Sequence, residues 1–376
     1  MTGIRLNFAA LTDVGRARAH NEDAVGFSEP PPPELYPREN CFYLQPPSPM
    51  VRAAKGAIFI VADGMGGHQA GEVASRMAIN RIIQNYYADP DPNIQTALIR
   101  AVQAANAEIY AHAQASPAQS GMGTTVVAAV VKDSGEVQIA HVGDSRAYFV
   151  RGKQIKQITK DHSWVQEQVE AGVLTPEQAR THPQRNVITR ALGSKPDVLV
   201  DSHQGKLDPG DVLVLCSDGL SGLVSDEEIR QVVTSQPPQQ AAHTLVNMAN
   251  ERGGTDNISV VVLKALPAPA AIPERVIPKP AAPPRRFPSP VPIIVGVIIG
   301  MLALVAIAAG LWLVKPGQPK DIETPTATTV VSVTTPTTSA PVVVLTGTPT
   351  QAPATVTAPT ATLVPTNTPT LSLIHI

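Results

Sequence analysis

Residues 57–68 read AIFIVADGMGGH, an uninterrupted apolar run that ends at Asp63 and is followed by Gly64. A short apolar run bounded by glycines is typical of a buried strand. Asp63 therefore stands at the end of such a strand, where an ionised carboxylate is costly unless it has a partner. This stretch predicts a buried strand with a charged site at its end.

Two later apolar runs are flanked in the same way, by Asp218 and by Asp256, and a further acidic group lies at Asn21-Glu22-Asp23. If these carboxylates meet, too few basic residues lie nearby in the sequence to neutralise them, and a divalent cation is the simplest partner. A set of oxygen ligands favours Mg²⁺ or Mn²⁺ over zinc or copper. The alternative is that each Asp merely forms a turn beside Gly or Asn.

Eight motifs in order, over roughly residues 7–263, resemble the bacterial PP2C-type (PPM) metal-dependent serine/threonine protein phosphatases. Any one of these motifs would be weak, but eight in the family's order are specific. They are TDVGRARAHNED (12–23), DGMGGH (63–68), GMGTT (121–125), HVGDSRAY (141–148), TKDHSWV (159–165), HPQRNVITRALG (182–193), CSDGL (216–220) and GGTDNISVVV (253–262).

The pattern of elements agrees with an α+β fold. Apolar residues recur at helical spacing over 71–87 and 94–115, and a meander of strands runs from 124 to 158. Helix pairs that alternate with strand meanders indicate two antiparallel sheets between helices. The resemblance implies the same four-layer sandwich of two antiparallel sheets flanked by helix pairs, with a flap subdomain at about 163–193. The proline-rich stretch 29–56 is expected to form an irregular surface excursion.

The resemblance also implies roles for the acidic residues. Asp63 would bridge two metal ions, with Gly64 offering its backbone carbonyl, and Asp218 and Asp256 would complete the first ion's ligands. A water held between two such ions can attack a phosphate ester in line. Glu22 would hold the second ion through water.

Three further residues carry expectations from the resemblance. Asp144 would hold a third, weaker ion shared with Asp218, or else it is a turn residue paired with Arg146. Asp23 would orient the ligands without binding metal itself. Arg18 matches the family's phosphate-binding arginine, whose guanidinium can contact two phosphate oxygens at once.

Three histidines and one methionine bear on proton transfer. Met65 stands where animal members of the family have a histidine that is the proposed general acid, so this role would fall to a metal-bound water or be absent. We expect His68 to stabilise its loop. His162 and His182 lie in flap motifs, where we expect structural roles.

The composition of the chain bears on its partners and on its cellular compartment. A formal charge of −2 gives no basic stripe, and nucleic acid is not an expected partner. Cys41 and Cys216 are expected to be reduced thiols, which fits a cytoplasmic setting. The N-terminus lacks the features of a signal peptide.

The chain divides by composition into four parts. Residues 1–265 form the expected phosphatase domain, and 266–292 a proline-rich linker. Residues 293–314 hold no charged residue and no proline, which predicts a single transmembrane helix, and 315–376 form a Thr/Pro-rich, low-complexity tail. Basic residues concentrate before the span, so the positive-inside rule places the phosphatase domain in the cytoplasm and the tail outside the cell.

The resulting interpretation is a membrane-anchored phosphatase that hydrolyses phosphoserine and phosphothreonine in proteins. Its expected partners are phosphoproteins, among them a eukaryotic-type bacterial kinase and its targets. Two alternatives remain open at this point. One is a catalytically inactive regulator that binds phosphoproteins at the membrane, and the other is a structural protein linked to the cell surface or wall.

Overall fold

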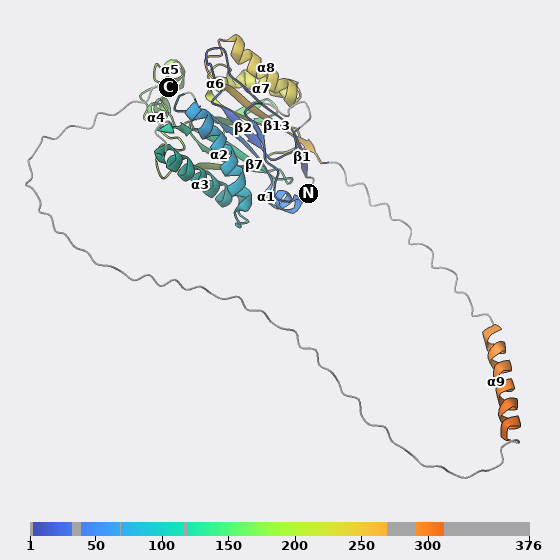
Figure 1. Cartoon of the computed structure of the whole chain (residues 1–376). Coiled ribbons are helices and arrows are strands. Elements are labelled where there is room, and N and C mark those ends of the chain that lie inside the picture. Colours follow the sequence, from blue (N-terminus) through green and yellow to red (C-terminus); the bar gives the residue numbers. More distant parts are fainter. Residues whose placement is uncertain (1–2, 32–38, 68, 116–118, 269–290, 312–376) are drawn as a thin grey trace, which may run out of the picture. The chain divides into compact units, whose positions relative to one another are not determined.

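The computed structural model describes residues 3–31, 39–67, 69–115, 119–268 and 291–311. The chain falls into two compact units, which divide after Glu274. The fold and the candidate site belong to the first unit. Its chain begins in one sheet, builds most of a second, and then passes between the two before it ends in the first, so that both sheets contain segments that are distant in the sequence (Figure 1).

The first sheet has five antiparallel strands in the order β1-β13-β12-β9-β10. The long strand β13 is paired along its full length with the N-terminal strand, from Ile4 opposite Pro267 to Asp13 opposite Ile258. The bounds are β1 (Ile4–Asp13), β9 (Arg146–Arg151), β10 (Gln154–Gln157), β12 (Val212–Cys216) and β13 (Ile258–Pro267).

The second sheet has six strands in the order β11-β8-β7-β4-β2-β3. Four of its five pairings are antiparallel, but β3 runs parallel to β2. The expectation of purely antiparallel sheets is therefore wrong at this edge. The bounds are β2 (Ala24–Phe27), β3 (Cys41–Tyr43), β4 (Ala57–Ala62), β7 (Val126–Val131), β8 (Glu136–Val142) and β11 (Asp201–Lys206).

The strand β4 shows why the sheets and helices stack. Successive side chains of a strand point to opposite faces. Ile58 and Ile60 pack against helices, whereas Phe59 and Val61 pack between the two sheets. The ring centroid of Phe59 lies 5.1 Å from that of Phe8 on β1. A strand covered on both faces has to be apolar throughout, as AIFIVA is.

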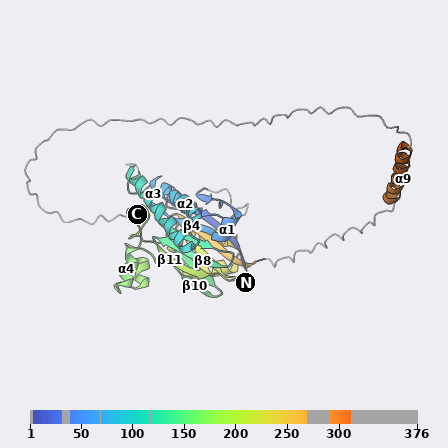
Figure 2. The same cartoon turned by 90° about the horizontal axis from the view of Figure 1, so that it is seen from below.

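Helix pairs cover the outer faces of both sheets. The helices α2 (Gln69–Ala88) and α3 (Ile94–Ala115) lie side by side against the sheet that holds β4 and β8 (Figures 1 and 2). The helices α7 (Asp226–Ser235) and α8 (Pro238–Glu251) cover the other sheet, where Leu245 and Ile229 are fully buried. The four-layer sandwich expected for the phosphatase domain is thus confirmed.

The excursion at 29–56 is more regular than expected. It contains β3 and the helix α1 (Pro49–Lys55). Proline is compatible with the first turn of a helix, because the N–H it lacks would have no helical partner there. The Ser48 side chain accepts a hydrogen bond from the Val51 N–H and caps this helix. Residues 32–38 of the excursion lie outside the described part.

The strand β11 was not expected from the sequence either. Its residues DSHQGK are polar and show no apolar pattern. They are compatible with a strand here because β11 is an edge strand whose side chains are half-buried or exposed. Asp201 at its start pairs with His141 of β8.

The flap begins at Ser163 and holds two short helices, α4 (Trp164–Glu170) and α5 (Pro176–Thr181). Its two ends are joined at the base. Ser163 forms an isolated bridge with Ile188, and the Trp164 N–H donates to the Val187 carbonyl at 2.8 Å. The expected flap at about 163–193 is therefore a separate loop closed on itself (Figure 2 shows α4 beside the sheet edge at β11).

The second unit contains the helix α9 (Val291–Leu311). Within the described ranges, no helix combines the length and the apolar character that crossing a membrane requires. Part of the expected span at 293–314, most of the linker at 266–292 and the whole tail at 315–376 lie outside the described residues, as does His68.

Candidate active site

Three strand ends converge on one carboxylate cluster. Asp63 follows β4 of the second sheet, Asp218 begins the short helix α6 (Asp218–Ser221) directly after β12, and Asp256 lies just before β13. The Asp63 side chain is hydrogen bonded to Asp218, and the charges of Asp218 and Asp256 both act on Asp63. The structure thus gathers the three strand-end aspartates that the sequence singled out.

The cluster favours protonation in the absence of a cation. Burial raises the pKa of Asp63 well above its usual range, and the charges of Asp23 and Asp218 raise it further. Burial and the Asp256 charge raise the pKa of Asp218 to about 6, partly offset by the hydrogen bond with Asp63. Crowded carboxylates of this kind are stabilised in their charged form by a nearby positive ion.

Orphaned oxygens show that a divalent cation fits here. Asp218 Oδ1 and Asp144 Oδ1 are buried and have no hydrogen-bond partner among the described residues. A buried carboxylate oxygen normally has a partner. Carboxylate and backbone oxygens are the ligands that Mg²⁺ and Mn²⁺ prefer.

Gly64 is held where no side chain would fit. A Cβ at this position would lie 2.2 Å from the Gly71 carbonyl oxygen and 2.6 Å from that of Glu22. The Gly64 N–H donates to the Glu22 carbonyl at 3.2 Å, and Ser75 Oγ donates to the same carbonyl at 2.6 Å. The loop that carries Glu22 is therefore packed tightly against the loop that follows Asp63.

Asp23 takes a different place from its neighbour Glu22. Its side chain is wholly buried, and its Oδ2 accepts a hydrogen bond from Ser217 Oγ at 2.8 Å. Burial raises the pKa of Asp23 to about 7, against the effect of hydrogen bonds from Ser259 and Ser217. Because Ser217 immediately precedes Asp218, this contact fits the expectation that Asp23 orients ligands.

Two residues with clear roles in the cluster were not identified from the sequence as site residues. Asn257 is buried, and its Oδ1 accepts from the Glu22 N–H at 2.8 Å, which ties the Glu22 loop to the residue after Asp256. Thr125 Oγ1 accepts from the Asp63 N–H at 3.2 Å. Both belong to quoted motifs, GGTDN and GMGTT, but nothing in the spacing indicates which partner they contact.

Arg18 lies at the edge of the cluster. Its Nη2 donates to Asp256 Oδ2 at 2.7 Å, and its side chain is 36% exposed. A pocket of about 750 Å³ opens beside it, lined also by Glu22, Met65 and Gly66. The rest of the guanidinium can therefore meet an anion that enters this pocket.

Asp144 lies in a second pocket, of about 390 Å³, which it shares with Asp218 and Asp256. Flap residues, including Val165 and Arg180, form the other wall of this pocket. Burial raises the pKa of Asp144 well above its usual range, as does the Asp218 charge.

Arg146 does not act as the partner of Asp144. It forms a two-pronged ion pair with Asp161, with Nη2 2.6 Å from Oδ2 and Nε 3.0 Å from Oδ1. The ion pair of Arg146 is therefore made with Asp161, whereas on the pKa of Asp144, which burial raises, the Arg146 charge acts only as a smaller, lowering effect.

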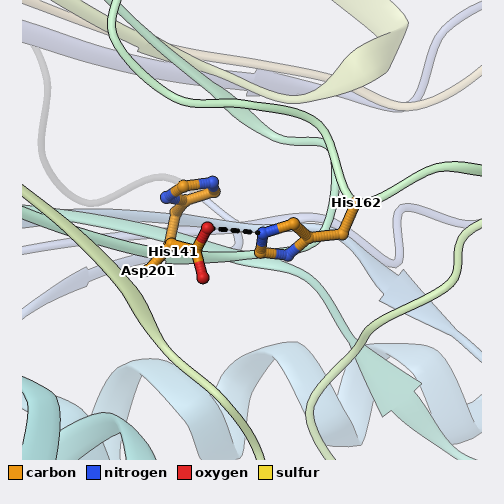
Figure 3. A group of neighbouring side chains, drawn as sticks. All are labelled: His141, His162 and Asp201. Atoms are coloured by element: carbon orange, nitrogen blue, oxygen red, sulfur yellow. Dashed lines mark ion pairs between the residues drawn. The ribbon is translucent and has the colours of Figure 1, made fainter. Parts of the chain in front are cut away.

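A second cluster consists of His141, His162 and Asp201, whose ligand atoms lie within 4.8 Å of one another (Figure 3). The Gly143 N–H donates to His162 Nδ1 at 3.0 Å. His162 Nδ1 must then carry the lone pair and Nε2 the proton, so neither nitrogen of His162 is free for a metal. Of this cluster, only His141 Nδ1 and Asp201 then remain as possible ligands in the described arrangement.

His182 lies within the flap, with its ring 5.1 Å from that of Trp164, and its Nδ1 accepts from the Gln184 N–H at 3.1 Å. These contacts give it the structural role that was expected.

Comparisons with known proteins point to one family. A family model described as protein phosphatase 2C matches residues 48–259. The chain is 38% identical over 259 residues to the serine/threonine phosphatase stp of Listeria monocytogenes, covering 67% of this chain and 93% of the relative. It is 37% identical over 258 residues to the serine/threonine protein phosphatase PstP of Mycobacterium tuberculosis, covering 68% of this chain and 44% of the relative.

Solved structures give the same picture. The crystal structure of the M. tuberculosis phosphatase PstP/Ppp superposes with a TM-score of 0.59 at 37% identity, over 70% of this chain and 100% of that one. A structure of the PstP catalytic domain in complex with two manganese ions has a TM-score of 0.56 at 35% identity, over 70% of this chain and 99% of that one.

Proposed function

Because the chain belongs to the protein phosphatase 2C family, we propose that it is a metal-dependent phosphatase acting on phosphoserine and phosphothreonine in proteins. The observation that carries this proposal is the convergence of Asp63, Asp218 and Asp256 from two sheets, with the Asp218 Oδ1 oxygen left unpaired among the described residues. The named relatives are serine/threonine phosphatases, and one of them was solved with two manganese ions.

The proposed ligands follow from the site. Asp63, the Gly64 carbonyl, Asp218 and Asp256 would hold two Mn²⁺ or Mg²⁺ ions, with Glu22 contributing through water. When bound, such ions offset the negative charge of the phosphate and produce a nucleophile from water at neutral pH. Asp23 keeps the Ser217–Asp218 turn in place through its hydrogen bond with Ser217.

Two residues of the pocket bear on phosphate binding and on the protonation of the leaving group. Arg18 would bind phosphate oxygens in the pocket that it lines with Glu22, and Asp256 fixes the orientation of its guanidinium. Met65 lines the same pocket and cannot donate a proton to the leaving serine or threonine oxygen. Asp144 and Asp218 would hold a weaker third ion, which would supply the proton donor that Met65 lacks.

The substrates that we propose are phosphoproteins, including a eukaryotic-type bacterial Ser/Thr kinase and its targets. The pocket between Asp144 and the flap supports a protein substrate, because it extends the surface beyond the phosphate site. The phosphatase would thereby counteract the kinase.

We also propose a location on sequence grounds alone. The 22 residues 293–314 carry no charge, and Arg275, Lys279, Arg285 and Arg286 precede them. After them come only Lys315 and Lys320, with two acidic residues close by. A single membrane anchor with the phosphatase domain in the cytoplasm fits this charge pattern.

The main competing function is a phosphoprotein-binding regulator without activity. A phosphothreonine peptide labelled with a fluorophore separates the two, because anisotropy reports binding and phosphate release reports turnover. We expect the purified full chain with Mn²⁺ to release phosphate from phosphothreonine and phosphoserine peptides. Binding of the peptide without phosphate release would establish the regulator instead.

A further inference from the structure

His162 lies where the flap joins the body of the domain, and it contacts the turn that carries Asp144. The His162 N–H donates to the Gly143 carbonyl at 3.0 Å, and the Gly143 N–H donates back to His162 Nδ1 at 3.0 Å. Gly143 thus makes two hydrogen bonds with one residue. Because Asp144 follows directly, the position of its backbone depends on His162.

On the far side of the His162 ring, Asp201 accepts from the ring and Arg190 pairs with Asp201. With Nδ1 occupied as an acceptor, the proton is on Nε2, which lies 3.3 Å from Asp201 Oδ2 (Figure 3). Arg190 Nη1 lies 3.0 Å from Nε2 as well, and it donates to Asp201 Oδ1 at 2.7 Å, so that the carboxylate accepts from both groups. Arg190 lies near the second end of the flap, and Asp201 begins the edge strand β11.

The surroundings keep the ring neutral and fixed in orientation. Burial lowers the pKa of His162, and the Arg190 charge lowers it further. The ring of His141 stacks on it with a centroid separation of 4.8 Å and an interplanar angle of 19°. Burial lowers the pKa of His141 to about 4, and its Nε2 contacts the Lys160 carbonyl at 2.9 Å.

The Asp144 turn reaches the rest of the site through Thr125. Ser145 Oγ and Thr125 Oγ1 are hydrogen bonded at 2.7 Å, and Thr125 Oγ1 also accepts from the Asp63 N–H. Gly143 has a φ of +106°, and a Cβ there would lie 2.5 Å from the Thr125 side chain. The turn is therefore confined from both sides, by Thr125 and by His162.

The flap is seated on the same residue. The Thr189 N–H donates to the His162 carbonyl at 2.8 Å, and the adjacent Ser163 bridges to Ile188. His162 consequently joins both ends of the flap to the Asp144 turn.

We propose that His162 is a positioning residue, which sets the Asp144 carboxylate through its Nδ1 contact with Gly143 and couples that carboxylate to the seating of the flap. The inference rests on the proposed function in one respect, namely that Asp144 holds a metal ion. It goes beyond the structural role expected of His162, because it assigns the weakest metal site a dependence on one nitrogen atom of one side chain.

A matched pair of substitutions tests the Nδ1 contact. In His162→Asn, the amide oxygen takes the place of Nδ1 and still accepts from Gly143, but the contact with Asp201 is lost. In His162→Gln, the amide nitrogen takes the place of Nε2 and still reaches Asp201, but the acceptor for Gly143 is lost. The two variants remove opposite halves of the same network.

The measurement is Mn²⁺ binding to the metal-free full chain by isothermal titration calorimetry, with Asp144→Ala as the reference for loss of the weakest site. We expect His162→Gln to weaken the weakest site by about tenfold or more, as substitutions of residues that orient ligands do. His162→Asn should stay within about twofold of wild type, a difference that amounts to less than 1 kcal/mol. In activity, His162→Gln should lower kcat on a phosphothreonine peptide with a smaller change in KM.

The possible results are distinguishable. Equal weakening in both variants, or in neither while Asp144→Ala loses the site, would overturn the positioning role and leave the proposed function intact. If Asp144→Ala itself binds as many ions as wild type, the third-ion assignment falls, and the inference falls with it. Should the His162 variants fail to fold, Asp201→Ala carries the same test through the tautomer of the ring. Without the carboxylate, Arg190 Nη1, which lies 3.0 Å from Nε2, can donate to that nitrogen, so that the proton moves to Nδ1 and the acceptor for Gly143 is lost. Weakening of the weakest site is then expected, and unchanged binding would contradict the role.

Discussion

Asp63 is the residue on which the proposed centre depends most. Residues next to strands of both sheets contact it. Asp218, after β12, contacts its side chain, and Thr125, before β7, accepts a hydrogen bond from its backbone N–H. The pKa of Asp63 is raised by burial and by neighbouring carboxylates, so its negative charge is unfavourable when no cation is bound. Stability and activity should therefore respond differently when this charge is removed.

We predict that Asp63→Asn lowers phosphatase activity at least about tenfold, since a neutral amide cannot bridge two divalent ions. The metal-free variant should melt at the same temperature as wild type or higher, because the substitution removes repulsion inside the cluster. Phosphate release and thermal melting of the same preparations check both parts. Activity above about a tenth of wild type would refute the bridging role.

Arg18 gives a second prediction at this scale. Arg18→Ala should raise KM for a phosphopeptide more than it lowers kcat, because the guanidinium binds phosphate in the ground state and in the transition state alike. A lost charged hydrogen bond typically amounts to about 2 kcal/mol, or roughly 30-fold in kcat/KM. Arg18→Lys is the control, and it should recover only part of the loss because lysine lacks the planar fork. Unchanged kinetics in Arg18→Ala would mean that Arg18 serves only to pair with Asp256.

The sequence predicted the acidic residues of the site better than the residues that hold them in place by hydrogen bonds. Asp63, Asp218 and Asp256 could be found because a carboxylate at the end of a buried apolar run needs a partner that the nearby sequence does not supply. Asn257 and Thr125 could not be assigned, because their roles arise from contacts between residues that are distant in the sequence, such as the 235 positions that separate Glu22 from Asn257. The contact between Gly143 and His162 could not be predicted for the same reason.

At the scale of elements, the flap forms one wall of the pocket that contains Asp144. Its helices α4 and α5 contribute Val165 and Ala179 to the pocket that contains Asp144 and Asp218. The flap is joined to the body of the domain through the hydrogen bonds between His162 and Gly143 and through the bridge between Leu192 and Thr124. A substitution at Asp144 should therefore change the activity of the enzyme on protein substrates.

We predict that Asp144→Ala retains two tightly bound Mn²⁺ ions, lowers turnover and raises the Mn²⁺ concentration needed for activity. The loss should be larger on a phosphoprotein than on an aryl phosphate, whose good leaving group needs no proton. Steady-state kinetics on both substrates across a Mn²⁺ series give the measurement. Equal losses on both substrates would contradict the proton role, and no loss on either would contradict the metal assignment.

Strands and helices could be predicted from the sequence where buried side chains leave a clear apolar pattern. The strand β4 and the helices α2 and α3 follow directly from apolar runs and helical spacing. The strand β11 was missed, because an edge strand with exposed side chains has no apolar pattern. The helix α1 was missed because prolines dominate its surroundings, although Ser48 and Pro49 together form a suitable helix start.

For the whole molecule, the location of the phosphatase domain can be tested in cells. Protease added to intact bacteria that express the chain should remove the Thr/Pro-rich residues 315–376 and spare residues 1–265, because the basic flank precedes the uncharged segment. Immunoblots with tags at each end report the two fragments, and permeabilised cells serve as the control. Digestion of residues 1–265 in intact cells would mean that the orientation is reversed, and protection of both ends would argue against the anchor.

The central claim is that this chain hydrolyses protein phosphoesters with metal ions held by Asp63, Asp218 and Asp256. The most direct test is phosphate release from a phosphothreonine peptide by the purified full chain, first stripped of metal with a chelator and then supplied with Mn²⁺. We predict no release after stripping, and recovery of turnover as Mn²⁺ is added. Full activity in the stripped chain, or no activity at any Mn²⁺ concentration in a folded chain, would contradict the claim.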